Sequence, residues 1–142
     1  MTSFDKRLNA AWWALRVGLA AEQIVAGVDK FFNKITDWTM YLSPIATKVV
    51  PMEPAHFMRT IGIVEIVLGI LLLTQWTKLG AYLIMAWLLG IVINLLTTGM
   101  FYDLAVRDFE VAIAAFSLAQ ISAVRSAAGV RNAATEAAIL VR

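Results

Sequence analysis

The chain has 142 residues, of which 61% are hydrophobic and only 15% are charged, whereas ordinary soluble domains carry about 25% charged residues. It has no cysteine and a single histidine, which excludes disulfides, iron–sulfur clusters and thiolate metal sites within this chain, and haem held by two of its own histidines. The net charge of +2 is too small to indicate a nucleic-acid partner. We therefore expect one integral membrane domain over residues 1–142.

The first predicted helix, residues 9–31, carries charges that a lone membrane span accommodates poorly. Arg16 and Glu22 lie inside its apolar run. A charge near the centre of a membrane helix costs about 2.5–3.5 kcal/mol, whereas a good apolar residue contributes only about 0.3–0.6 kcal/mol. Partners from other helices are therefore expected around it. A cleavable signal peptide, with Lys6 and Arg7 as its basic region, is the alternative for this segment, but the apolar stretch is as long as a full span and Arg16 interrupts it.

Residues 32–54, which we call the flap, form the longest connection between predicted helices. Its hydrophobic residues recur at helical spacing, which predicts a short amphipathic helix. The residues at this spacing are Phe31, directly before the flap, and Ile35, Trp38 and Leu42 within it. The pair Ser43-Pro44 is expected to end this helix. Because aromatic residues favour the headgroup region, we expect the flap to lie at the membrane interface; a re-entrant loop is the alternative.

Three further spans are predicted at residues 55–76, 79–98 and 104–124. The run Leu79–Tyr102 contains 24 residues without a charge, and a membrane helix needs about 20. Asn94 is the strongly polar residue inside this run. Together the elements predict an all-α fold, an integral membrane four-helix bundle with a short interfacial segment between its first and second helices.

Four spans would place both termini on one side of the membrane. Six basic residues would lie near that side and five near the other. The six are Lys6, Arg7, Lys78, Arg125, Arg131 and Arg142, and the five are Lys30, Lys34, Lys48, Arg59 and Arg107. The positive-inside rule then predicts that both termini are cytoplasmic. The Ala-rich tail, residues 125–142, would also be cytoplasmic and is expected to form a short helix on the membrane surface.

The polar residues of the spans fall on a few helical faces among small residues, which let helices approach one another. We expect them to converge on one pocket beneath the flap. The ligand-binding candidates are Arg16, Gln23, Lys30, Glu65 and Arg107. The residues expected to form a structural ion network are Glu22, Asp29, Arg59, Asp108 and Glu110. Buried ion pairs can also fix helix packing without any ligand, so both interpretations stay open for the whole set.

One group of residues has the side-chain types of a soft-metal site. His56 is close in sequence to Met52 and Met58, and imidazole and thioether groups are ligands for soft metals. Methionine and histidine at a membrane interface need no such ligand, however. We therefore predict no metal site.

The order of these features resembles the DoxX-like family of four-helix membrane proteins over roughly residues 13–125. The resemblance rests on three stretches, LRVGLAAEQIVAGVDKFF, IGIVEIVLGILLL and YDLAVRDFEVAIAAFSLA. Gly27 followed by Lys30 is also similar to the way the family ends its first helix. Carried over by position, the resemblance points to Arg16, Lys30, Glu65 and Asp108. The long aromatic flap departs from the most compact members of the family.

The resemblance implies a function in a redox complex. The family includes the small membrane subunit of a thiosulfate:quinone oxidoreductase, and other members associate with soluble oxidoreductases. We therefore expect an accessory membrane subunit, in the bacterial inner membrane, that offers a polar pocket to a quinone or a small oxyanion. It would hold no covalently bound cofactor or redox centre, and whether it takes part in catalysis is left open. Its expected partners are the lipid bilayer and other protein subunits or a second copy.

Two other functions compete with this one. The chain could be a structural or assembly subunit without ligand chemistry, in line with a distant eukaryotic branch of the family that acts as an assembly chaperone for receptors. The chain could instead be a small transporter or channel, which four spans without an internal repeat disfavour.

Overall fold

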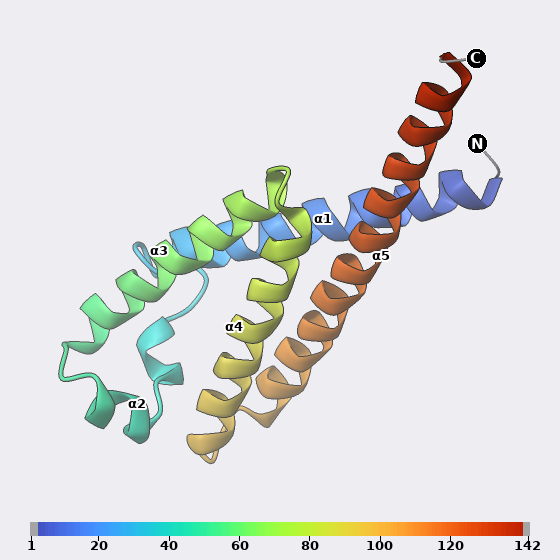
Figure 1. Ribbon diagram of the computed structural model, residues 1–142. Coiled ribbons are helices and arrows are strands. Elements are labelled where there is room, and N and C mark those ends of the chain that lie inside the picture. Colours follow the sequence, from blue (N-terminus) through green and yellow to red (C-terminus); the bar gives the residue numbers. More distant parts are fainter. Residues whose placement is uncertain (1–2, 141–142) are drawn as a thin grey trace.

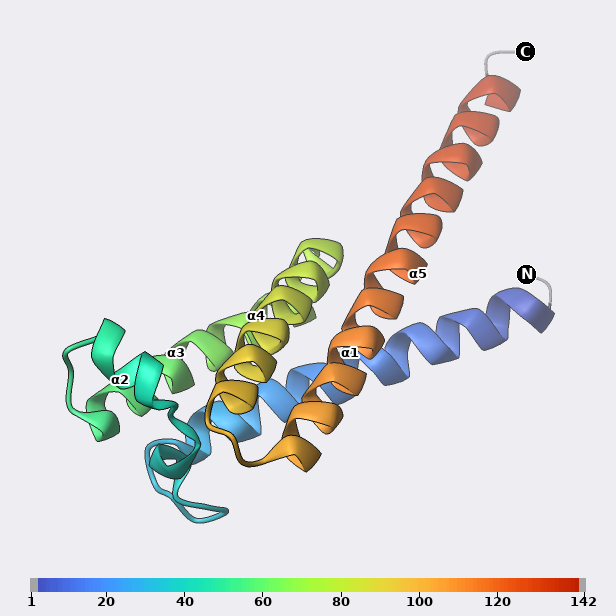
Figure 2. The same cartoon turned by 90° about the horizontal axis from the view of Figure 1, so that it is seen from below.

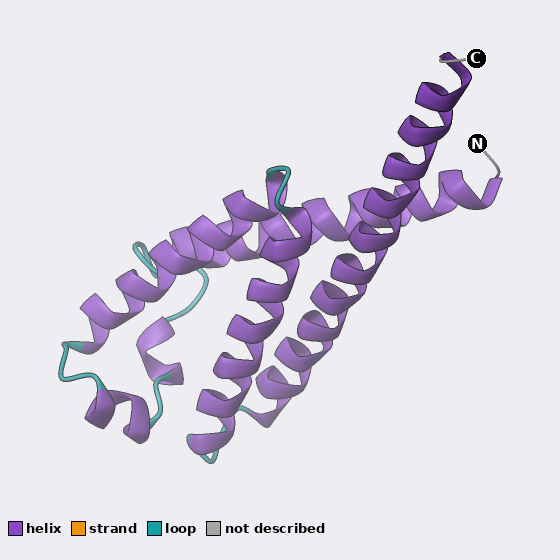
Figure 3. Cartoon of the chain, viewed as in Figure 1, coloured by secondary structure: helices purple, strands orange, loops and turns teal. Residues whose placement is uncertain are grey.

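The computed structural model describes residues 3–140, whose regular elements are all helices, joined by loops and turns (Figures 1 and 3). The elements are α1 (Ser3–Asp29), the 3-10 helix η1 (Trp38–Tyr41), α2 (Pro44–Val49), α3 (Pro54–Leu73), α4 (Thr77–Thr97) and α5 (Tyr102–Leu140). The predicted all-α class is confirmed. Arg142, one of the basic residues used to predict the topology, lies outside the described residues.

Three helices of the described chain are long and apolar enough to cross a membrane: α3, α4 and the part of α5 over Tyr102–Arg131. They correspond to the second, third and fourth predicted spans. α1 is not among the three, because Arg16, Glu22 and Gln23 interrupt its apolar run. A fourth span over residues 9–31 therefore stays a prediction.

α1 and α3 pack antiparallel along a seam of small residues. A Cβ atom added to Gly62 would lie 2.5 Å from the carbonyl oxygen of Gly27, and one added to Gly27 would lie 2.6 Å from the carbonyl oxygen of Gly62. Two turns further along, Gly69 faces Ala20, whose carbonyl oxygen is 3.0 Å from the position of an added Cβ. The seven-residue spacing keeps these small residues on one face of each helix, so the two backbones come into direct contact.

α4 and α5 form an antiparallel hairpin and lie side by side in both ribbon views (Figures 1 and 2). The chain turns between them with a positive φ at Gly99 and Phe101. Small residues of α5 let it approach α4 closely. The buried residues at the centre of the bundle include Leu72, Ala81, Ile84, Leu88, Ala112, Ala115 and Leu118. The molecule is thus built from two antiparallel helix pairs.

The flap contains two short helices where one was predicted. η1 is a single turn, and it ends at Tyr41 before the Ser43-Pro44 pair. The pair then begins α2, because the Ser43 hydroxyl accepts a hydrogen bond from the N–H of Ala46 and proline suits the first position of a helix. The first short helix thus ends just before Ser43-Pro44, and the pair also begins a second helix that was not predicted.

α5 continues without a break to Leu140. The separate surface helix predicted over residues 125–142 is not formed, because the Ala-rich segment has high helix propensity and offers no proline or cap to interrupt α5. Figure 1 shows the end of α5 projecting beyond the other helices, on the side of the turn between α3 and α4. Residues 141–142 of the predicted tail lie outside the described residues.

Candidate functional site

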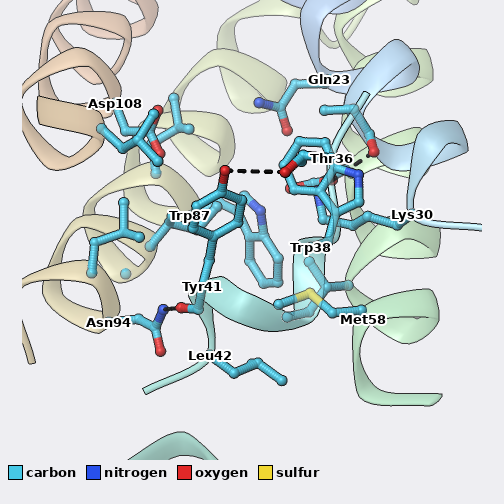
Figure 4. Close-up of a pocket in the computed structure, with 18 of the residues that line it drawn as sticks. Gln23, Lys30, Thr36, Trp38, Tyr41, Leu42, Met58, Trp87, Asn94 and Asp108 are labelled. Carbon is cyan, nitrogen blue, oxygen red and sulfur yellow. Dashed lines mark hydrogen bonds and ion pairs between the residues drawn. The ribbon is translucent and has the colours of Figure 1, made fainter. Parts of the chain in front are cut away.

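A cavity of about 640 Å³ lies between the α1–α3 pair and the α4–α5 hairpin, with the flap forming another of its walls (Figure 4). Most of its wall is apolar, with Phe57 and Ile61 from α3 and Ile91 and Leu95 from α4. Ligand pockets typically measure about 300–1,000 Å³ and combine apolar walls with a few polar groups. This cavity therefore has the size and character of a small-molecule site.

A buried ion pair lies in the wall of this cavity. Lys30 follows the end of α1 and Glu65 lies within α3, and the distance from Lys30 Nζ to Glu65 Oε2 is 2.6 Å. Both side chains are only 4% exposed. The Lys30 ammonium also lies 3.7 Å from the centre of the Trp38 ring, where the negative face of the indole attracts a cation. Lys30 is thus held between a carboxylate and an aromatic face.

Asp29 positions this indole. The Nε1 of Trp38 donates to Asp29 Oδ2 at 2.8 Å. The same carboxylate accepts from the backbone N–H of Lys34 at 2.9 Å and of Ile35 at 3.0 Å. Asp29 therefore shapes the start of the flap, where Asn33 takes a positive φ, and fixes the ring that covers Lys30.

Asn94 attaches the middle of the flap to α4. Its Nδ2 donates to the carbonyl oxygen of Tyr41 at 2.7 Å, and its Oδ1 accepts from the N–H of Ser43 at 3.1 Å. The Tyr41 ring lies edge-on to Phe101, with centroids 4.9 Å apart. The side-chain amide of Asn94 thus pairs with two backbone groups of the flap, the carbonyl oxygen of Tyr41 and the N–H of Ser43 (Figure 4).

Two buried polar atoms that line the cavity have no hydrogen-bond partner among the described residues: Gln23 Oε1 and Trp87 Nε1. The other end of the Gln23 amide donates to Glu22 Oε2 at 2.8 Å. The Trp87 indole interacts with the Glu65 carboxylate as a donor, but the geometry falls short of a full hydrogen bond. Such buried atoms are rarely left unpaired, so one acceptor and one donor remain available to a ligand.

The other predicted site residues are divided between the cavity and the surface. Glu22, Arg107 and Asp108 line the cavity, and Arg107 Nη2 lies 2.9 Å from Asp108 Oδ1. Arg59 and Glu110 are exposed and do not belong to its wall. The helical faces inferred from the sequence thus bring Gln23, Lys30, Glu65, Arg107, Glu22 and Asp108 to one place, and leave Arg59 and Glu110 outside.

Arg16 does not join this group, contrary to expectation. Its guanidinium donates to the carbonyl oxygens of Leu72 at 2.9 Å and Thr74 at 2.8 Å, and to that of Leu73. Seven-residue spacing puts Arg16 and Lys30 on one stripe of α1, but fourteen residues of helix separate them by about 21 Å. Arg16 instead closes the carboxyl end of α3, at the opposite end of the bundle.

Sequence reasoning missed three residues that shape the cavity. Trp87 was not among the candidate residues, and Trp38 and Asn94 were placed in the flap and in the third predicted span without a role at the site. The sequence around a tryptophan in an apolar helix does not show whether its side chain lines a cavity or faces lipid.

Among the described residues, no group of three histidine, cysteine, aspartate or glutamate side chains could hold a metal ion. His56 is exposed, and its Nδ1 lies 3.1 Å from a carboxylate oxygen of Glu53.

The family model of DoxX matches residues 11–99 of the chain. The matched range begins inside α1 and includes the flap, α3 and α4, so it contains Lys30, Glu65, Trp87 and Asn94 but not the cavity residues of α5. No curated protein and no solved structure matches the chain.

Proposed function

Since the chain belongs to the DoxX family, whose model covers more than half of its 142 residues, we propose that it is a membrane subunit that binds a quinone beneath its flap for a partner oxidoreductase. One observation carries this proposal. The cavity contains a buried donor, Trp87 Nε1, and a buried acceptor, Gln23 Oε1, without protein partners among the described residues. A quinone carbonyl accepts a hydrogen bond and a quinol hydroxyl donates one, so these two atoms suit both redox states.

The carboxylates of the cavity can deliver the protons that quinone reduction requires. Reduction of a quinone to a quinol takes up two electrons and two protons. Glu65 and Glu22 line the cavity beside Lys30, and ionisable residues inside membranes commonly serve as proton relays. The chain has no cysteine and one histidine, so in this proposal the partner supplies the electron carrier.

The proposal includes an orientation. The flap and the turn between α4 and α5 lie at one end of the bundle, and the turn between α3 and α4 lies at the other, with the projecting end of α5 (Figure 1). Lys78, Arg125 and Arg131 lie towards the latter end, which we assign to the cytoplasm of a bacterium. The cavity then lies nearer the opposite face of the inner membrane.

Binding of decylubiquinone to the protein in lipid nanodiscs tests the proposal. Trp87→Phe removes the indole donor and keeps an aromatic ring in the wall. We expect it to weaken binding about tenfold, which corresponds to one lost hydrogen bond. Trp76→Phe is the matched control, because Trp76 is exposed at the turn between α3 and α4. Equal binding by the two variants would contradict a quinone site at Trp87.

A structural role in a larger membrane complex is the second candidate, and the Lys30–Glu65 pair favours it. The pair joins the end of α1 to α3 and fixes helix packing without any ligand. The double variant Lys30→Met/Glu65→Leu tests what the pair does, because apolar residues can replace a buried ion pair without loss of stability. A folded double variant that no longer binds decylubiquinone gives the pair a role in quinone binding, whereas unchanged binding leaves the pair a structural role only. Absence of decylubiquinone binding by the unaltered protein supports the structural subunit.

A further inference from the structure

A second cavity, of about 300 Å³, lies at the other end of the bundle, where α3 turns into α4. Its wall is basic and rich in hydroxyl groups. The lining residues are Trp12, Arg16, Thr74, Gln75, Thr77, Lys78, Ser122, Arg125 and Ser126. None of these described residues is acidic, so three cationic side chains share one hollow without a carboxylate in its wall.

Two of the cations share one aromatic platform. The guanidinium carbon of Arg16 lies 4.8 Å from the centre of the Trp12 ring, and that of Arg125 lies 4.2 Å from it. Trp12 is buried, at 7% exposure, and its Nε1 donates to Ser122 Oγ at 2.7 Å. The indole is therefore fixed between α1 and α5, and it holds two like charges close together.

Among the described residues, the hydrogen-bond acceptors of these guanidinium groups carry no negative charge. Arg16 donates to the backbone carbonyl oxygens of Leu72, Leu73 and Thr74, and Arg125 donates to the side-chain oxygen of Asn9. These acceptors are uncharged. Two guanidinium groups held this close repel one another, so an anion in the cavity would stabilise the arrangement.

The cavity lies at the depth of lipid phosphate groups. α3 ends at Leu73 and α4 begins at Thr77, so the turn between these two membrane-capable helices marks a boundary between lipid and water. Trp76 in this turn is 57% exposed, as is typical of tryptophan at the headgroup level. Basic pockets between membrane helices are suited to the phosphate groups of anionic lipids.

We propose that this second cavity is a phosphate-binding site formed by Arg16, Arg125 and Lys78 around Trp12. The planar guanidinium groups suit the paired oxygens of a phosphate, and Lys78 adds a flexible charge at the rim. The ligand is either the headgroup phosphate of an anionic lipid or a free phosphate ion. The site is independent of the cavity beneath the flap and of quinone binding.

The thermal unfolding midpoint of the purified protein in a neutral detergent tests this site. The probes are phosphatidylglycerol, phosphatidylcholine and inorganic phosphate, each added separately. We expect phosphatidylglycerol or inorganic phosphate to raise the midpoint, and phosphatidylcholine to leave it unchanged. A response to phosphatidylglycerol alone identifies a lipid site, and a response to inorganic phosphate as well identifies a site for the free ion. An equal response to phosphatidylcholine overturns the proposal.

Variants of Arg125 and Lys78 locate the effect. Arg125→Gln and Lys78→Gln should each weaken the binding of the effective probe about tenfold, because each removes a charged hydrogen-bond donor, and Arg125→Lys should restore most of it. Arg59→Gln is the matched control, because it removes an exposed charge at the opposite end of the bundle. If Arg125→Gln disturbs the helical content, Lys78→Gln carries the test. Binding by both variants equal to that of the control overturns the site.

Discussion

Lys30 Nζ and Glu65 Oε2 lie 2.6 Å apart in a place where both side chains are almost fully buried, so each charge depends on the other. Removing one partner of a buried pair leaves an uncompensated charge and typically costs about 3–5 kcal/mol. We expect Glu65→Gln to lower the free energy of unfolding by about this amount. Lys30→Met/Glu65→Leu should recover most of the loss, because it removes both charges together.

Urea unfolding in a mild detergent, followed by circular dichroism, measures this difference. Glu110→Gln is the control, because Glu110 is exposed on α5 and should change the free energy of unfolding by less than about 0.5 kcal/mol. If Glu65→Gln is as stable as Glu110→Gln, the pair does not contribute to the fold.

The carboxylate of Asp29 supports the start of the flap through three hydrogen bonds. Asp29→Asn replaces a charged acceptor by an amide with one acceptor oxygen, and so it cannot satisfy the three donors equally. We expect faster amide hydrogen exchange across residues 32–43 and a loss of about 1–3 kcal/mol in stability. Mass spectrometry of peptides from this segment measures the exchange. Asp103→Asn, at an exposed position in the first turn of α5, should leave the flap unchanged; similar exchange in both variants would argue against the role of Asp29.

Asn94 holds the flap over the cavity, and its replacement should open the cavity. Asn94→Leu keeps a similar volume but removes both hydrogen bonds to the flap. The chain has no cysteine, so Ala26→Cys introduces a single thiol into the cavity wall. We expect this thiol to react with a water-soluble maleimide several-fold faster when Asn94→Leu is also present. Thr97→Val, which removes an exposed hydroxyl one turn away, is the control. Equal reaction rates with Asn94→Leu and with Thr97→Val would show that Asn94 does not hold the flap closed.

The contact between Gly27 and Gly62 leaves no room for a side chain. A Cβ atom at Gly62 would lie 2.5 Å from a backbone oxygen, so Gly62→Ala must push α1 and α3 apart, at a cost of about 1–3 kcal/mol. Gly18→Ala provides the contrast, because an added Cβ there meets nothing within 4 Å and alanine favours a helix by about 0.5–1 kcal/mol. The thermal midpoint should fall for Gly62→Ala and stay or rise for Gly18→Ala; a fall in Gly18→Ala alone would contradict this packing.

The parts of the fold that were predictable follow from local patterns. The charge-free run Leu79–Tyr102 required a membrane-length helix, and α4 lies within it. Helical periodicity predicted polar residues on helical faces among small residues, and on α3 Glu65 lies with Gly62 and Gly69 on the face that turns toward α1. These inferences succeed because they depend only on residues a few positions apart in one helix.

The parts that were not predictable depend on how helices cross. Arg16 and Lys30 share a stripe of α1, but the sequence does not say that α3 ends beside Arg16 and so presents its last carbonyl groups to it. The partners of Asn94 are backbone atoms of the flap, and a pattern of side chains in the sequence does not reveal a backbone partner. The position of Trp38 over Lys30 depends on the path of the flap, which the sequence does not show either.

The length of α5 determines how far its last turns lie from the cavity beneath the flap. Its 39 residues extend about 58 Å, and even a tilt of 40° leaves about 44 Å along the membrane normal, against a hydrocarbon thickness of about 30 Å. If α5 crosses the membrane, part of it therefore extends beyond the hydrocarbon layer. An enzyme attached there would work above the opposite face of the membrane from the flap, so a diffusing carrier, not direct contact, would have to link it to the cavity.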